Sequence, residues 1–275
     1  MILTYTNSKG EVFNLLSNGL RVKEGNFHAY QWIPQVVSGL LGDSVKGFGK
    51  NALNYTTTLC FKGTDAERKA TLNAFHAATE TDIINQAPGT LKWGDDYVKC
   101  YIIASSTHPT DETPSWTLNE IDIYVPYPFW MRDVTRSFVA GTASTSAGLD
   151  YPYNYSYDYY PGQIGSDVWA SGHYAPSDFT MIIYGPCTNP TVSVNGHTYG
   201  VYDTLSAGDY VEIDSRDQTV TKYLSGGTNS NIFDLRTKTE SVFDRMPAGD
   251  LTLTWSGTFG FDITLHEERS EPEWI

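Results

Sequence analysis

Residues 126–130 read Pro-Tyr-Pro-Phe-Trp, and a stretch of small residues from Ala140 to Gly148 follows shortly after. A Pro-x-Pro step fixes two φ angles and removes two backbone donors, so a central strand cannot run through it. Strand-like segments lie on both sides of this step, and the small residues after it are typical of a linker. The stretch therefore predicts two β-rich domains in series, which we place at residues 1–135 and 136–275.

The composition supports two folded domains and argues against several kinds of partner. A chain of 275 residues is long enough for two domains of about 130 residues, each with its own core. Aromatic residues make up 14%, with 19 Tyr and 7 Trp, which suits β-sheets and wet binding surfaces. The formal charge of -14 argues against tight binding to nucleic acid or to anionic lipid.

The cysteines, histidines and N-terminus carry no signal for metals, cofactors or membranes. Three cysteines at wide spacing do not form a disulfide framework, and no two of the six histidines are three to five residues apart. The first residues lack a basic region followed by an apolar core, and no run of about 18 apolar residues occurs. We therefore expect no metal site, no cofactor, no signal peptide and no membrane span.

The first domain shows one hairpin and one helix. Ile2 to Thr6 and Glu11 to Leu16 are strand-like and flank a turn. Thr64-Asp65-Ala66-Glu67 is a capping box, which predicts a helix that ends at Ala87-Pro88-Gly89. The apolar stripe of this helix is expected to consist of Leu72, Phe75, Thr79 and Ile83.

The segment from Ser38 to Lys50 is rich in glycine. It holds four glycines, Asp43 and two lysines, and it predicts a long loop or a protruding hairpin. A compact domain rarely keeps such a segment unless the segment has a use.

The second domain consists of short strands with turn signals between them. Phe179 to Tyr184 is apolar on both faces and predicts a central strand. Asn195-Gly196 is a strong two-residue hairpin signal. Strands at this spacing predict an antiparallel sandwich, so the fold class is mainly β with two β-sandwich domains.

No motif of a catalytic site is present, and we predict that the chain is not an enzyme. No Gly-x-Ser-x-Gly nucleophile motif occurs. The adjacent acids Asp95-Asp96 and Glu267-Glu268 would point to opposite faces of a strand, so we interpret them as a turn and a solvated tail. A glycosidase whose two carboxylates converge from distant strands is the one catalytic alternative.

The tract from Tyr151 to Tyr160 has tyrosine at most of its positions. It could be one face of a strand that packs its own sandwich, a surface for a protein partner, or a surface that stacks on sugar rings. The candidate residues for a partner or glycan surface are Tyr151, Tyr153, Tyr155, Tyr157, Trp169 and Tyr174.

A series of local patterns extends over nearly the whole chain. It starts with the opening hairpin Thr6 to Glu11 and the Pro126–Trp130 stretch. The C-terminal half adds the most specific patterns, which are Gly185-Pro186 to Asn189-Pro190, Val211 to Ser215, Phe243 to Gly249, and Glu271 to Trp274. In order and spacing, this series resembles the distal tail protein (Dit) family of long-tailed phages and prophages of Gram-positive hosts, in which the first two patterns are similar to the start and close of the N-terminal domain.

The resemblance implies a structural role in the virion, at the distal end of the tail. Family members assemble as hexameric rings that join the tail tube to the tip or baseplate. The N-terminal domain would resemble tail-tube proteins, with one helix and a long hairpin that contacts neighbouring subunits. In this chain that hairpin would be Ser38 to Lys50, with interface residues Gly39, Gly42, Asp43, Lys46 and Phe48.

The implied partners are other tail proteins and further copies of this chain. They are the major tail tube protein, the tail-associated tip protein, and a receptor-binding protein or tail fibre held by a galectin-like or carbohydrate-binding-module-like C-terminal domain. DNA would pass through the ring without specific binding, because part of the negative charge would line the channel. The alternative hypothesis is a lectin-like protein that binds cell-wall glycan through exposed aromatic side chains.

Overall fold

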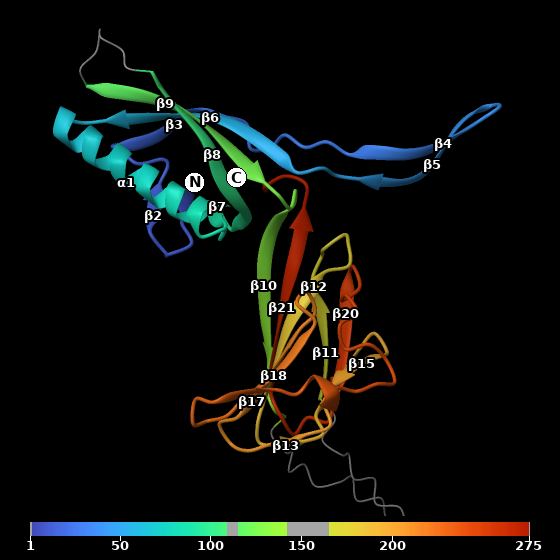
Figure 1. Ribbon diagram of the computed structural model, residues 1–275. Helices are drawn as coiled ribbons and strands as arrows, with labels where there is room; N and C mark the ends of the chain where they lie inside the picture. Colours follow the sequence, from blue (N-terminus) through green and yellow to red (C-terminus); the bar gives the residue numbers. More distant parts are fainter. Residues whose placement is uncertain (1, 109–114, 142–164, 275) are drawn as a thin grey trace, which may run out of the picture. The chain divides into compact units, whose positions relative to one another are not determined.

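The computed structural model describes residues 2–108, 115–141 and 165–274 (Figure 1). The chain is mainly β, and α1 (Asp65–Ile84) is the one α-helix among these residues. The expected mainly β fold class is confirmed, and the chain divides into two compact units. Unit 1 comprises Met1–Arg132 and Glu268–Ile275, and unit 2 comprises Asp133–Glu267.

Unit 1 is built from antiparallel strands in the orders β3-β6-β9-β8 and β8-β7-β1-β2, with α1 packed against β6 and β8 (Figure 1). Its core combines residues of both ladders with Phe75 of the helix. The strands of this unit are β1 (Leu3–Thr6), β2 (Val12–Asn14), β3 (Leu20–Glu24), β4 (Ile33–Gly39), β5 (Gly42–Gly49), β6 (Leu53–Lys62), β7 (Gly89–Trp93), β8 (Asp96–His108) and β9 (Trp116–Val125).

The capping box that the sequence predicts begins α1. The Thr64 hydroxyl accepts from the Glu67 backbone N–H, and the Glu67 carboxylate accepts from the Thr64 backbone N–H. The helix ends at Ile84, a few residues before the predicted stop. The prediction that Ile83 is part of the buried stripe is wrong, because Ile83 is exposed and Asp82 is fully buried in its place.

Asp82 is buried because two donors of the opening hairpin satisfy it. Tyr5 Oη donates to Asp82 Oδ2 at 2.5 Å, and the Ser8 backbone N–H donates to Asp82 Oδ1 at 2.8 Å. Burial, and then the bond to Asp82, raise the pKa of Tyr5, which keeps its hydroxyl protonated as the donor. A buried carboxylate is tolerated where its hydrogen bonds are made in this way.

Unit 2 contains two main antiparallel sheets, in the orders β19-β18-β17-β12-β21-β10 and β11-β20-β14-β15, and residues of both form one core. β12 is central, with β17 and β21 on its two sides, as the sequence predicts. The strands are β10 (Trp130–Phe138), β11 (Gly165–Ala170), β12 (Asp178–Tyr184), β13 (Cys187–Thr188), β14 (Thr191–Val194), β15 (His197–Gly200), β16 (Thr204–Leu205), β17 (Tyr210–Asp214), β18 (Thr219–Tyr223), β19 (Asn229–Asn231), β20 (Asp250–Trp255) and β21 (Phe261–Arg269), with a 3-10 helix η1 (Phe233–Leu235).

The chain passes from unit 1 to unit 2 inside β10 and returns inside β21. As predicted, no strand runs through the Pro-x-Pro step, since β9 ends at Val125 and β10 begins at Trp130. The division after Arg132 lies three residues before the expected boundary at 135. Residues 268–275, which we expected in the second domain, group with unit 1.

The two acidic pairs agree only in part with their sequence interpretation. Asp95 lies in the turn between β7 and β8, as expected, but Asp96 begins β8 and is buried. Glu267 is buried, so it is not part of a solvated tail. Asp96 is paired with Arg132, and Glu267 Oε2 lies 3.6 Å from the buried His173 Nδ1. Local sequence could not reveal these partners, because they lie far along the chain.

Candidate assembly surface

The most unusual feature of unit 1 is a two-stranded antiparallel hairpin made of β4 and β5, which we call the arm (Ile33–Gly49). Figure 1 shows it as a long ribbon that extends beyond the other strands of this unit. Every residue of β4 is exposed, and six of the eight residues of β5 are exposed. An isolated hairpin of two strands is marginally stable in water, so packing against another surface would stabilise the arm.

The arm is apolar despite its exposure. Pro34 pairs with Phe48 and Val36 pairs with Val45, which places four apolar side chains on one face. Leu40 and Leu41 form the turn and are 106% and 104% exposed. Exposed apolar patches of this kind mark interaction sites. The large exposed hydrophobic residues of the arm are Ile33, Val36, Val37, Leu40, Leu41, Val45 and Phe48.

Glycine and a bulge shape the arm. Gly42 has φ +119°, a backbone conformation that residues with a Cβ rarely adopt. Gln35 pairs with Gly47 and Val36 with Val45, so Lys46 is an extra residue in β5. Such a β-bulge bends and twists a hairpin.

The five residues predicted for the hairpin interface all lie in the arm. Gly39 ends β4, and Gly42, Asp43, Lys46 and Phe48 belong to β5. All five are exposed. Their contact with a neighbouring subunit stays a prediction.

The predicted segment, Ser38 to Lys50, leaves out the first half of the arm, which begins at Ile33 and contains Pro34. Pro34 is tolerated because β4 pairs with β5 alone, so a missing N–H leaves no central ladder broken. The alternation of Ile33 and Gln35 before the glycines could have indicated the earlier start.

The root of the arm is held by Lys50, the first residue after β5. Its Nζ atom donates to the Pro128 carbonyl at 3.2 Å and to the Ser270 hydroxyl at 2.8 Å. It also lies 4.2 Å from the ring centre of Phe129, 4.7 Å from that of Trp32 and 5.4 Å from that of Tyr30. We call these residues the Lys50 cluster: Tyr30, Trp32, Lys50, Pro128, Phe129 and Ser270.

The candidate aromatic surface of unit 2 is only partly supported. Trp169 is 6% exposed and packs on Phe138 in the core, so the expectation that it is an exposed surface residue is wrong. Trp169 is buried because β11 pairs with β20 and turns this ring inward. Tyr174 is 71% exposed. Tyr151, Tyr153, Tyr155 and Tyr157 lie outside the described residues.

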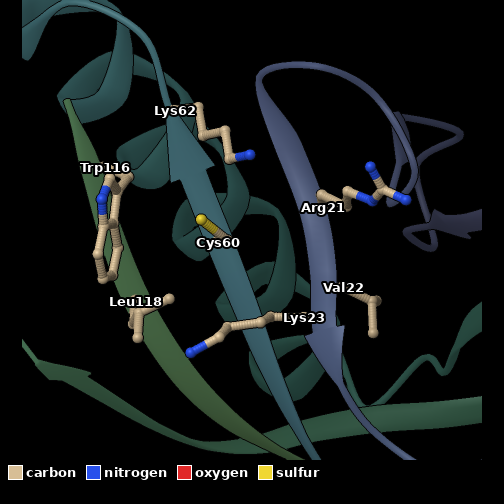
Figure 2. A pocket seen from close by; sticks show the side chains of 7 residues that line it. All are labelled: Arg21, Val22, Lys23, Cys60, Lys62, Trp116 and Leu118. Atoms are coloured by element: carbon tan, nitrogen blue, oxygen red, sulfur yellow. The ribbon is translucent and has the colours of Figure 1, made fainter.

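Unit 1 also has a hollow of about 530 Å³ over β3, β6 and β9. Figure 2 shows Cys60 on β6 between Lys62 and Lys23, with Trp116 and Leu118 on β9 beside it. Among the residues that the structure describes, its lining includes the cations Arg21, Lys23 and Lys62 and no carboxylate. Chemically, the hollow suits a carboxylate or phosphate group rather than a cation.

The described residues contain neither a metal-binding cluster nor a membrane-spanning helix. No group of three or more His, Cys, Asp or Glu side chains there could hold a metal ion. No helix in the described part of the chain is both long enough and apolar enough to cross a membrane.

Comparison with known proteins shows similarity in structure but not in sequence. No protein-family model matches the chain, and no curated protein sequence matches it. Among solved structures, the Dit protein (gp 19.1) of phage SPP1 matches with a TM-score of 0.63 and 9% identity, over 98% of this chain and 100% of that one. That protein is described as a paradigm of the hub adsorption apparatus in phages that infect Gram-positive bacteria.

Chains of the phage P2 baseplate in its activated conformation match equally well. The form with calcium gives a TM-score of 0.61 and 13% identity, over 99% of this chain and 100% of that one. The form with strontium gives 0.61 and 14%, over 98% and 99%. The resemblance that the sequence patterns suggested is confirmed at the level of the fold, which is that of SPP1 Dit along nearly the whole chain.

Proposed function

We propose that this chain is a structural subunit of a phage tail, the hub at the distal end that joins the tail tube to the tip or baseplate. The likeness to SPP1 Dit supports this role because it extends over 98% of the chain. The observation that carries the proposal is the arm, an exposed apolar hairpin of the kind that a neighbouring molecule covers.

In this proposal the subunits form a closed hexameric ring. Each arm contacts the next subunit, so every interface joins two different surfaces and closes only if the rotation between subunits brings the last to the first. Burial of a leucine side chain contributes roughly 1.5–3 kcal/mol. Leu40 and Leu41, both fully exposed, therefore offer the largest gain on assembly.

The proposed position of the ring at the distal end of the tail determines which proteins it would contact. The ring would contact the tail tube protein on one side and the tail-associated tip protein on the other, and unit 2 would hold a receptor-binding protein or tail fibre. The genome would pass through the ring without specific binding, because a net charge of -14 repels phosphate. The virion is the location of this assembly, and its chemistry requires no cofactor.

The experiment that tests the proposal measures mass by light scattering over a concentration series. The wild-type chain should reach about six subunits, and the double variant Leu40→Ser/Leu41→Ser should dissociate at concentrations where the wild type is assembled. The matched control is Ile2→Ser/Val12→Ser, which removes two exposed apolar side chains of unit 1 outside the arm. A wild-type chain that stays monomeric throughout, or an arm variant that assembles as the control does, contradicts the proposal.

A further inference from the structure

The Lys50 cluster joins four separate segments of unit 1 at one ammonium group. Trp32 directly precedes β4, and Lys50 directly follows β5, so both ends of the arm enter the cluster. Pro128 and Phe129 lie between β9 and β10, and Ser270 follows β21. The arm root is therefore attached to the body of the unit on two sides.

The contacts of the Lys50 ammonium group are directional, so they can fix the direction of the arm relative to the rest of unit 1. An ammonium within about 6 Å of an aromatic ring centre is attracted by the ring, and here three rings meet that condition. The two hydrogen bonds, at 2.8 and 3.2 Å, direct two of the three ammonium protons. Trp32 and Phe129 also touch edge to face, with ring centres 5.9 Å apart.

The arm root includes a glycine that adds little restraint of its own. Gly49 is the last residue of β5, pairs with Ile33 and has no side chain to pack against the body. Because glycine restricts the backbone less than other residues do, this root leaves the ribbon more freedom of direction than a root with packed side chains would. Without a fixed direction, the arm would lose more conformational entropy on meeting a neighbour.

We infer that Lys50 is a positioning residue, whose contacts with Trp32, Phe129 and Ser270 fix the direction of the arm before a second copy of this chain binds it. The role of the second copy rests on the proposed function, whereas the fixed direction is a property of one subunit. The two can therefore fail separately.

The primary test is a distance measurement inside one subunit, by pulsed electron paramagnetic resonance. Nitroxide labels are placed at Ser44→Cys in the arm and Lys92→Cys in β7, in a Cys187→Ser background, because Cys60 and Cys100 are buried. Labelled protein is diluted with unlabelled protein so that only distances within a subunit are recorded. The unmodified cluster should give one narrow distance distribution, and Lys50→Met should give a broad one.

Two further variants make the result specific. Lys9→Met removes the same charge from an exposed position of unit 1 outside the arm and should leave the distribution narrow. Trp32→Leu should also broaden it, and the double variant should be no broader than Lys50→Met alone, since Lys50→Met already removes the contact between Lys50 and Trp32. If Lys50→Met is as narrow as the wild type, or if Lys9→Met broadens the distribution equally, the inference is overturned.

The second readout is the protein concentration at which half of the subunits are assembled. Lys50→Met should raise the concentration of half-assembly by about tenfold, the size expected from the loss of a desolvated cation–π contact and its hydrogen bonds. A protein that never assembles would refute the proposed function and leave the distance test intact. A Lys50→Met protein with a broad distribution but wild-type assembly would overturn the link between arm direction and binding.

Discussion

The Asp96 carboxylate accepts two hydrogen bonds from the Arg132 guanidinium, at 2.8 and 3.0 Å, although Asp96 is buried. Arg132 also lies 2.6 Å from the Glu273 carboxylate, and the Glu273 backbone N–H donates to Asp96 at 2.7 Å. These contacts tie the last residues of the chain to β8 and the start of β10. They explain why residues 268–275 belong to unit 1.

The loss of Arg132 should destabilise unit 1 strongly. In Arg132→Leu the buried Asp96 carboxylate would lose its cation, and breaking one partner of a buried pair costs about 3–5 kcal/mol. Urea unfolding monitored by tryptophan fluorescence measures this change. Arg21→Leu, at an exposed arginine of the same unit, should change the free energy of unfolding by less than about 0.5 kcal/mol. Equal effects of the two substitutions would refute the assigned role of Arg132.

The same contacts predict that the C-terminal segment detaches in acid. The hydrogen bond and charge of Arg132 hold the pKa of Glu273 below its usual range. A carboxyl with a lowered pKa in the folded state stabilises that state above its unfolded pKa, and the contribution is lost as pH falls through the folded value. The fluorescence of the C-terminal Trp274, which stacks on His28 at 3.9 Å, should change in that range of pH. Glu273→Gln should remove the part of this change that depends on the carboxylate.

The buried Asp82 provides a stability test inside unit 1. Asp82→Ala would leave the Tyr5 hydroxyl and the Ser8 backbone N–H without their acceptor, at a cost of about 3 kcal/mol. Ile83→Ala, one residue further on, removes an exposed side chain and should cost less than about 1 kcal/mol. Thermal unfolding of both variants compares their stabilities. A larger loss of stability for Ile83→Ala than for Asp82→Ala would contradict the packing of α1 described above.

Lys50 should titrate well below an ordinary lysine. Burial lowers its pKa to about 8, while the Glu268 carboxylate acts in the opposite direction. Tyr30 is the other titratable side chain against it in the Lys50 cluster. An NMR titration of the lysine side-chain carbons should show one lysine that titrates near pH 8 in the wild type, and this signal should be missing from Lys50→Met.

The direction of the pH effect on stability follows from that pKa. The folded chain releases the Lys50 proton before the unfolded chain does, so the unfolded state binds more protons between pH 8 and about 10.4. The contribution of Lys50 to stability therefore rises over this range. Lys50→Met should lack this rise when the two proteins are unfolded in urea at the two ends of the range, and an identical rise in both would exclude Lys50 as its source.

Local signals in the sequence were enough for much of the fold. The Thr64–Glu67 capping box begins the helix, and Asn195-Gly196 forms the turn between β14 and β15 with both φ angles positive. The Pro126–Trp130 step separates β9 from β10. Each of these is decided by neighbouring residues, which is why the sequence predicts them.

The errors concern residues whose environment is set by distant partners. Asp82 and Asp96 are buried because Tyr5 and Arg132 reach them from other strands. Trp169 is a core residue because β11 pairs with β20 and not because of its neighbours in sequence. The Lys50 cluster could not be predicted at all, since its members come from four segments.

Cryo-electron microscopy of the purified chain would show directly whether the subunits form a ring through their arms. We expect a closed ring of six subunits with an open centre, in which the density of each arm lies against the adjacent subunit and covers Leu40 and Leu41. Monomers alone, or a ring whose arms contact no neighbouring subunit, would contradict it.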